Sequence, residues 1–356
     1  MSAPRLTQFA TAAGCAAKLR MSDLQRVIKE DPASRPARHD AVLVGYELSD
    51  DAAVVKLPGD DTRGLVMTTD FISPLVDDAF TFGAIAATNA LSDVYAMGGL
   101  PLYALNIVAF PEGELPLDVL SQIMNGAAHA CSSVGVPIVG GHTVRNPDLK
   151  FGLAVTGEVQ LDQVLSNDLA QAGQALVLSK ALGVGIIGTA IKRGLATSSQ
   201  AEAAIASMCR MNDVALRVAR RHGVTSATDV TGFGLCLHLS NILFGSRLRA
   251  RIDLAALPLL PGALELAAQG VVPGGSRANL ETVQPRLRGV TDAPDHLLRT
   301  VLACDAQTSG GLLLCVPKAN AQAALLDLRE TGHTAAVVGE LLPPTPEAPV
   351  GTIELM

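Results

Sequence analysis

The 356-residue sequence contains no tryptophan, only 3% aromatic residues and only 17% charged residues. With so few aromatic rings, it lacks the stacking platforms on which single-strand nucleic-acid binding depends. Its formal net charge of -7 also disfavours nucleic acid or an anionic membrane surface as the main partner. We therefore expect a protein that binds no nucleic acid.

Long apolar runs and paired cysteines are absent as well. Charged residues, glycine or proline interrupt every apolar stretch before it reaches the length of a membrane span. The first residues lack the apolar segment of a secretory signal peptide. The six cysteines are scattered with no Cys-x-x-Cys pair, which excludes a zinc ribbon and gives no disulfide framework. These absences predict a cytoplasmic protein with no membrane partner.

What the sequence does contain is a 49% hydrophobic content together with 33 glycines and 20 prolines, as tightly connected strands and helices require. Strand-like and helix-like segments are mixed in both halves, which predicts an α/β (α+β-type) fold of two domains. We expect a mobile leader at 1–40, an N-terminal domain at 41–160 and a C-terminal α/β domain at 170–345. Strands are predicted at 41–45, 52–57, 64–69, 102–110, 136–139, 151–159, 175–179 and 312–316, and long helices at about 82–97 and 117–134.

Aspartates mark the first group of candidate site residues. The apolar helix that ends at Gly98-Gly99 carries Asp93 one turn after Asn89, so both lie on one face. Further aspartates follow strand-like runs, namely Asp50, Asp51, Asp70 and Asp229. Clustered carboxylates repel one another unless a cation neutralises them, and Mg²⁺ prefers oxygen ligands. Singly, Asp93 could instead be solvated or pair with an arginine, and the others could form a turn, end a strand or cap a helix.

A cysteine and a glycine-rich segment form the second group. Cys15 follows a glycine in the polar leader, where we expect it to be accessible, and Lys18 would favour its thiolate. The alternative is an ordinary cysteine near a flexible end. The predicted turn at Gly140–Thr143 would let backbone amides approach a phosphate, or would simply be a glycine turn after a strand. A structural turn is expected at Thr308–Gly311, and packing or surface roles are expected for four histidines: His129, His222, His238 and His296.

Together these segments resemble the selenophosphate synthetase (selenide, water dikinase) family, within the aminoimidazole ribonucleotide synthetase-like superfamily. The resemblance runs from Leu6 to Leu341. The matching segments are Gly14-Cys15 with Lys18, Asp50–Ala53, Thr68–Phe71, Ala86–Ala90 with Ser92-Asp93, Ala96–Gly99, Gly140–His142, Phe151–Gly157, Thr228–Gly234 and Gln307–Leu313.

The resemblance implies ATP-dependent synthesis of selenophosphate from selenide and water, with release of AMP and orthophosphate. It implies Cys15 as the essential cysteine and Lys18 as the catalytic, ATP-contacting lysine. Mg²⁺ would be held by Asp51, Asp93 and Asp229. Further contacts to ATP would come from Leu48, Ser49, Asp50, Asp70, Asp93, Gly141, His142 and Thr143. The resemblance also implies a homodimer paired through its N-terminal sheets, with a selenium-delivery protein as a possible partner.

The sequence departs from the family at Ala16 and Ala17, where many relatives have a second glycine and a second cysteine. A relay between two adjacent cysteines is therefore excluded. Two alternatives compete with selenophosphate synthesis. The first is a superfamily enzyme that phosphorylates a carbonyl or amide oxygen, and the second is a non-catalytic nucleotide-binding paralogue. The retained Cys15 argues against both, because neither needs a thiol in the leader.

Overall fold

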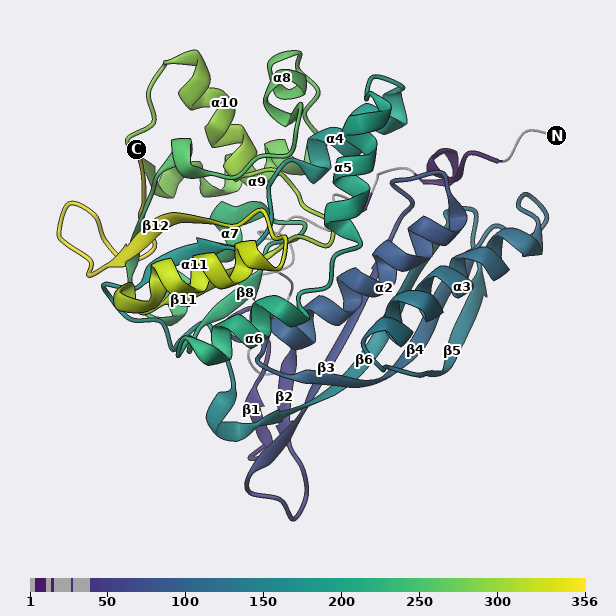
Figure 1. The fold of residues 1–356 in the computed structure, drawn as a ribbon, viewed down its shortest axis with the longest axis horizontal. Coiled ribbons are helices and arrows are strands. Elements are labelled where there is room, and N and C mark those ends of the chain that lie inside the picture. Colours follow the sequence, from purple (N-terminus) through teal and green to yellow (C-terminus); the bar gives the residue numbers. More distant parts are fainter. Residues whose placement is uncertain (1–3, 11–13, 16–26, 28–38) are drawn as a thin grey trace.

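The computed structural model describes residues 4–10, 14–15, 27 and 39–356 of the chain. Lys18 lies outside the described residues, as does most of the leader. Within the described part, a short 3₁₀ helix spans Leu6–Phe9, and the remainder forms two α/β halves, each built on one sheet (Figure 1).

The N-terminal half is a six-stranded sheet covered on one face by two helices (Figure 1). Across the sheet, the strands are β1 (Val42–Val44), β2 (Ala53–Lys56), β3 (Arg63–Ile72), β6 (Lys150–Gln160), β4 (Leu100–Phe110) and β5 (Ile138–Arg145). Neighbouring strands run antiparallel except β4 and β5, which are parallel. The covering helices are α2 (Ala79–Ala96) and α3 (Leu117–Ser133).

Strand β3 shows why only one face of this sheet is covered. Its side chains alternate, so that Val66, Asp70 and Ile72 are buried beneath the helices, whereas Met67 and Phe71 are exposed on the opposite face. The covered face therefore carries a buried carboxylate among apolar residues. The uncovered face carries large apolar side chains.

The C-terminal half is a seven-stranded sheet whose three strands at one end are buried on both faces. Its strands, in order across the sheet, are β10 (Leu287–Arg288), β13 (Ile353–Leu355), β9 (Arg249–Ile252), β12 (Ala336–Leu342), β7 (Ala175–Leu178), β11 (Leu312–Val316) and β8 (Ala227–Asp229). The helices are α4 (Val184–Arg193), α5 (Ser198–Met208), α6 (Asp213–Arg221), α7 (Gly234–Gly245), α8 (Ala263–Ala268), α9 (Gly274–Val283), α10 (Pro294–Ala303) and α11 (Ala321–Glu330).

The continuous apolar run of β11 reflects this double burial. Leu312 and Leu314 pack into one core with residues of α6 and α11, whereas Leu313 and Cys315 pack into a second core with residues of α7. A strand that faces helices on both sides needs no polar alternation, which is why the five residues are all buried.

The predicted two-domain α/β class with helix-covered mixed sheets is confirmed. One local prediction is wrong, because Gly140–Thr143 is not a turn but the middle of β5. These residues pair with β4 in register, from Leu105 opposite Gly140 to Val108 opposite Thr143. Glycine tolerates an extended backbone, and the neighbouring strand supplies the hydrogen bonds that select it. Among the described helices, none has the length and apolar character needed to cross a membrane.

Candidate active site

Helix α2 lies at the junction of the two halves and carries the first site residues. It packs on β3 and β6 of its own sheet and also contacts α5, α6 and β8 of the other half. Its residues from Phe82 to Ala96 are all buried, so its apolar composition follows from contact on every side. Asn89 and Asp93 are therefore polar groups inside the protein, and each has a partner there.

An acidic cavity of about 250 Å³ opens beside this helix face. Its lining includes Asp50, Asp51, Asp70, Asp93 and Asp229, so the structure brings all the sequence-predicted aspartates together. They come from distant parts of the chain: the loop before β2, strand β3, helix α2 and the end of β8.

Hydrogen bonds hold the carboxylates in place around the cavity. Thr68 Oγ1 donates to Asp93 Oδ2 at 2.5 Å, and Asn89 Nδ2 donates to Asp70 Oδ2 at 2.7 Å. Asp51 accepts from two groups of β8, the Thr228 hydroxyl at 2.9 Å and the Asp229 backbone N–H at 3.3 Å. The carboxylates are thus oriented by groups that lie on both halves of the protein.

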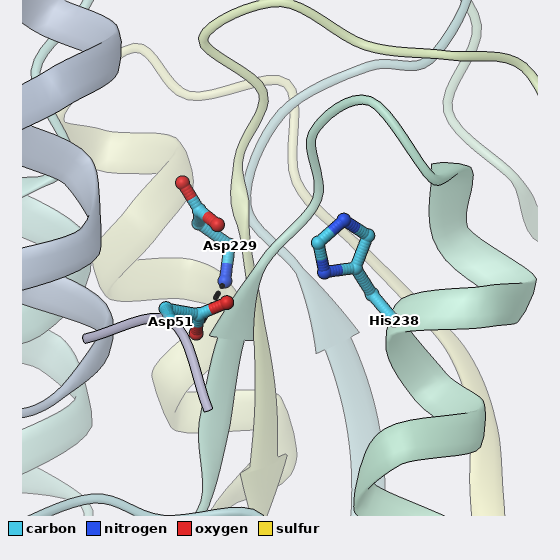
Figure 2. Close-up of side chains that lie close together, drawn as sticks. All are labelled: Asp51, Asp229 and His238. Atoms are coloured by element: carbon cyan, nitrogen blue, oxygen red, sulfur yellow. Dashed lines mark hydrogen bonds between the residues drawn. The ribbon is translucent and has the colours of Figure 1, made fainter. Parts of the chain in front are cut away.

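The concentrated negative charge of the carboxylates favours the binding of a cation. Burial, followed by the negative charges of Asp229 and Asp93, raises the pKa of the Asp51 carboxyl well above its usual value. Ligand atoms of Asp51, Asp229 and His238 lie within 4.8 Å of one another (Figure 2). Carboxylate oxygens this close, at the end of a strand, match the oxygen ligands that Mg²⁺ uses. The residues present therefore fit a divalent metal.

Asp50 has a different role from Asp51. It accepts hydrogen bonds from the Asn167 backbone N–H at 2.8 Å and from the Ser166 hydroxyl at 3.2 Å. The Asn167 side chain in turn donates to the carbonyl oxygens of Leu48 and Ser49, both at 3.2 Å. Loop 48–50 is therefore fastened to the segment that joins the two halves, at the rim of the acidic cavity.

Cys15 is seated at the same junction. Its backbone N–H donates to Thr308 Oγ1 at 3.0 Å, and its thiol lies 3.4 Å from Asn89 Oδ1 as a donor. The side chain of Cys15 is buried, with 1% of the residue exposed, so the expectation of an accessible thiol is wrong. The physical reason is this pair of partners, Asn89 from α2 and Thr308 from the C-terminal half, which enclose it.

Two glycines allow Cys15 to pack this closely against the C-terminal half. Gly14 has a φ of +54°, a conformation that favours glycine, and a Cβ there would meet Thr308 Oγ1 at 2.3 Å. A Cβ on Gly232 would lie 2.7 Å from the Cys15 carbonyl oxygen. Both glycines are therefore required for the close approach of Cys15 to the C-terminal half.

Gly141, His142 and Thr143 lie apart from this site within the chain. They are exposed on β5, an edge strand that β6 and β4 separate from β3. None of them lines the acidic cavity. The chain by itself therefore does not bring this predicted phosphate contact to the aspartates.

The sequence predicts a packing or surface role for His238 and offers no reason to place it in the site. It lies on α7, is buried, and lines the acidic cavity beside Asp51 and Asp229. The one available signal was its position shortly after Asp229 on the helix that follows, which brings a side chain back toward the end of β8.

A larger groove of about 730 Å³ adjoins the acidic cavity. The two share Tyr46, Asp50, Asp51, Thr68 and Thr69. Beyond this shared rim, the groove is lined largely by apolar side chains of β1 to β3, including Val42, Val55 and Met67. An elongated ligand with one charged end and one flat apolar end would fit the pair.

Known families match both halves of the chain. Residues 49–159 match the family described as AIR synthase related protein, N-terminal domain, and residues 171–348 match its C-terminal domain. Selenide, water dikinase of Myxococcus xanthus (strain DK1622) is 47% identical over 95% of this chain and 94% of its own length. Selenide, water dikinase of Shewanella sp. (strain MR-4) is 41% identical over 97% of this chain and 96% of its own length.

Solved structures share the fold at lower identity. Thiamine-monophosphate kinase from Stenotrophomonas maltophilia K279a has a TM-score of 0.63 and 20% identity, and the match covers 95% of this chain and 96% of that one. Hydrogenase maturation protein HypE in complex with ATP has a TM-score of 0.62 and 20% identity, over 99% of this chain and 94% of that one. The two family matches and the identity over nearly the full length show that the chain belongs to the selenide, water dikinase family of AIR synthase related proteins.

Proposed function

We propose that this chain catalyses the reaction of its family, in which ATP, selenide and water give selenophosphate, AMP and orthophosphate, and that Cys15 and the acidic cavity form its active site. One observation carries the proposal: Asn89 contacts both Cys15 and Asp70, so the buried thiol adjoins the carboxylate cluster. A relative that phosphorylates oxygen has no use for such a thiol.

The acidic cavity is the proposed binding site for the triphosphate and its metal. Asp51, Asp93 and Asp229 would hold Mg²⁺, while Asp70, Asp93 and loop 48–50 would contact ATP. The metal would neutralise phosphate charge that the carboxylates would otherwise repel. The hydrogen bonds from Thr68, Asn89 and Thr228 orient three of these carboxylates before a ligand arrives, which lowers the cost of binding. Lys18, outside the described residues, would add a cation beside the phosphates.

The adjoining groove is the proposed site for the adenosine. Its apolar walls and its volume of about 730 Å³ suit a planar base and a ribose, and its shared rim leads directly to Asp51. Selenide would then meet the terminal phosphate between the metal ligands and Cys15. Two anions approach each other more easily in a site shielded from bulk solvent, and the buried position of the thiol supports such a site.

A homodimer is the proposed assembly. Met67, Phe71, Tyr103 and Leu105 expose large apolar side chains on the uncovered face of the N-terminal sheet, which a second copy of the chain would bury. Pairing of two such faces would also bring the β5 segment 141–143 toward the nucleotide of the partner. That would supply the phosphate contact that is missing within one chain.

Replacing Leu105 with glutamate tests this assembly. A charge on the uncovered face should convert the dimer to a monomer in sedimentation velocity, and selenophosphate formation should fall with it. Leu195→Glu is the matched control, because Leu195 is similarly exposed but lies in the C-terminal half. A wild-type protein that sediments as a monomer, or a Leu105→Glu protein that stays dimeric, would count against the proposal.

The division into a leader at 1–40, an N-terminal domain at 41–160 and a C-terminal domain at 170–345 belongs to the same proposal, supported by the two separate sheets.

A cytoplasmic location is proposed because none of the six cysteines, all of which are among the described residues, forms a disulfide. A selenium-delivery protein is proposed as a further partner, and rates with free selenide and with protein-bound selenium would test it.

Phosphorus NMR of the purified protein with Mg²⁺-ATP tests the reaction itself. Under anaerobic conditions, a selenophosphate resonance together with AMP and orthophosphate should appear only when selenide is added. Conversion of ATP to ADP at a rate indifferent to selenide would overturn the proposal and would favour an oxygen-phosphorylating activity.

A further inference from the structure

His238 is a buried side chain for which the proposed reaction assigns no role. It projects from α7 toward the end of β8, where Asp51 and Asp229 lie (Figure 2). The ring packs against Phe233, with 5.9 Å between the ring centroids, so its orientation is restricted. One of its ring nitrogens lies within 4.8 Å of a carboxylate oxygen of each of these two aspartates.

The hydrogen bonds of His238 fix which nitrogen carries the proton. Nε2 lies 3.2 Å from the backbone N–H of Thr231, which can only donate, so Nε2 accepts. The Thr231 hydroxyl, at 3.3 Å, lies near the same nitrogen. In the neutral ring, Nδ1 must then carry the proton, and it lies 3.2 Å from Thr228 Oγ1.

The direction of the next hydrogen bond follows from this arrangement. Because Thr228 Oγ1 accepts from His238 Nδ1–H, its own proton is available to an acceptor. Two acceptors are near, Asp51 Oδ1 at 2.9 Å and the Asp229 carbonyl oxygen at 3.3 Å. The shorter contact to a charged carboxylate is the stronger one. A chain of hydrogen bonds, all donated in the same direction, therefore runs from the Thr231 amide through His238 and Thr228 to Asp51.

We propose that His238 is a positioning residue, which through the Thr228 hydroxyl aims the Asp51 carboxylate at the metal that accompanies ATP. The inference rests on the proposed function, since Asp51 is a metal ligand only there. Direct ligation by His238 would compete with these contacts, because Nε2 already accepts from Thr231 and Nδ1 donates to Thr228. The Asp229 amide holds the other Asp51 oxygen at 3.3 Å, so the two donors together fix the plane of the carboxylate.

Outer partners of this kind change metal affinity by about 10- to 100-fold when removed. We therefore expect Thr228→Val, which keeps the shape of the side chain but removes the hydroxyl, to weaken metal binding by that factor. His238→Phe should weaken it similarly, because it leaves the Thr228 hydroxyl free to turn toward the Asp229 carbonyl oxygen. Thr228→Ser keeps the hydroxyl and should bind metal like the wild-type protein.

The measurement is Mn²⁺ binding to the full chain by electron paramagnetic resonance, with a non-hydrolysable ATP analogue, so that no turnover is required. Thr300→Val is the matched control, because the buried Thr300 hydroxyl bonds to the His296 carbonyl oxygen on α10. Its Mn²⁺ affinity should not change, whereas a general loss of stability from removing a buried hydroxyl would affect both valine variants.

The outcomes separate this inference from the proposed function. Weakened Mn²⁺ binding in Thr228→Val and His238→Phe, with recovery in Thr228→Ser, supports the positioning role. Wild-type Mn²⁺ affinity in Thr228→Val overturns the inference and leaves the metal site intact. Absence of Mn²⁺ binding by the wild-type protein would overturn the metal site and this inference together.

Discussion

Replacing Cys15 with serine is expected to lower selenophosphate formation by at least about 10³-fold, the range in which the loss of a single catalytic group falls. Serine can keep both hydrogen bonds that Cys15 makes, since its backbone N–H can donate to Thr308 Oγ1 and its hydroxyl can donate to Asn89 Oδ1. A hydroxyl, however, does not ionise near neutral pH as a thiol does, and the thiolate is the reactive form.

ATP affinity should not change in the same variant, because Cys15 is not among the residues that line the acidic cavity or its adjoining groove. Phosphorus NMR gives the product, and fluorescence titration with a labelled ATP analogue gives the affinity. Cys209→Ser is the control, since Cys209 is half-buried and lines neither cavity. Undiminished selenophosphate formation by Cys15→Ser would remove Cys15 from the chemistry, and a loss of ATP binding would move it to the nucleotide site.

Cys15 is the only cysteine in the leader sequence, which makes a larger loss of activity expected in Cys15→Ser. Ala17 stands where many relatives have a second cysteine, so no neighbouring thiol can take over the function of Cys15. The other five cysteines lie far from Cys15 in the sequence, on α3, α5, α7, α10 and β11 or at the ends of these elements. Loss of activity in Cys15→Ser should therefore be complete rather than partial.

Much of the fold could be predicted from local patterns. The apolar run Leu312–Val316 was predicted as a strand with the bounds that the structure gives, because five consecutive apolar residues suit a strand covered on both faces. Helix α2 was predicted from its apolar length and from the glycines that end it. The Gly140–Thr143 segment was misread as a turn, because paired glycines predict turns locally while the partner strand that extends them, β4, lies far away in sequence.

The site divides in the same way. The aspartates could be predicted because four of them follow strand-like runs and the fifth, Asp93, lies on an apolar helix one turn after Asn89. All of them match segments of the family, and all of them line one cavity. The burial of Cys15 could not be predicted, because the residue that accepts from its backbone, Thr308, is 293 positions away. His238 was missed for a related reason, since its link to Asp51 passes through Thr228 and depends on how α7 returns to β8.

Replacing Asp93 with asparagine is the second large-effect prediction. Mg²⁺-dependent nucleotide affinity should fall by about 10²- to 10³-fold, because a charged ligand to the metal is worth several kcal/mol and 1.36 kcal/mol corresponds to a factor of ten. The side chain keeps its shape and can still accept from Thr68 Oγ1, so the fold should be retained. Isothermal titration calorimetry with Mg²⁺ and a non-hydrolysable ATP analogue measures the affinity.

The same variant should be more stable than the wild-type protein when metal is absent. Asp93 is one of the charges that raise the pKa of Asp51, so in the metal-free protein the carboxylates repel one another and oppose folding. Asp93→Asn removes part of this repulsion and should raise the melting temperature without metal, while reducing the further rise that Mg²⁺ and nucleotide produce. Asp162→Asn, at an exposed position outside the cavity, should change neither value. A lower metal-free melting temperature with unchanged nucleotide affinity would mean that Asp93 only supports the fold. Higher metal-free stability together with weaker nucleotide affinity would identify Asp93 as a metal ligand that the protein retains although it lowers the stability of the fold.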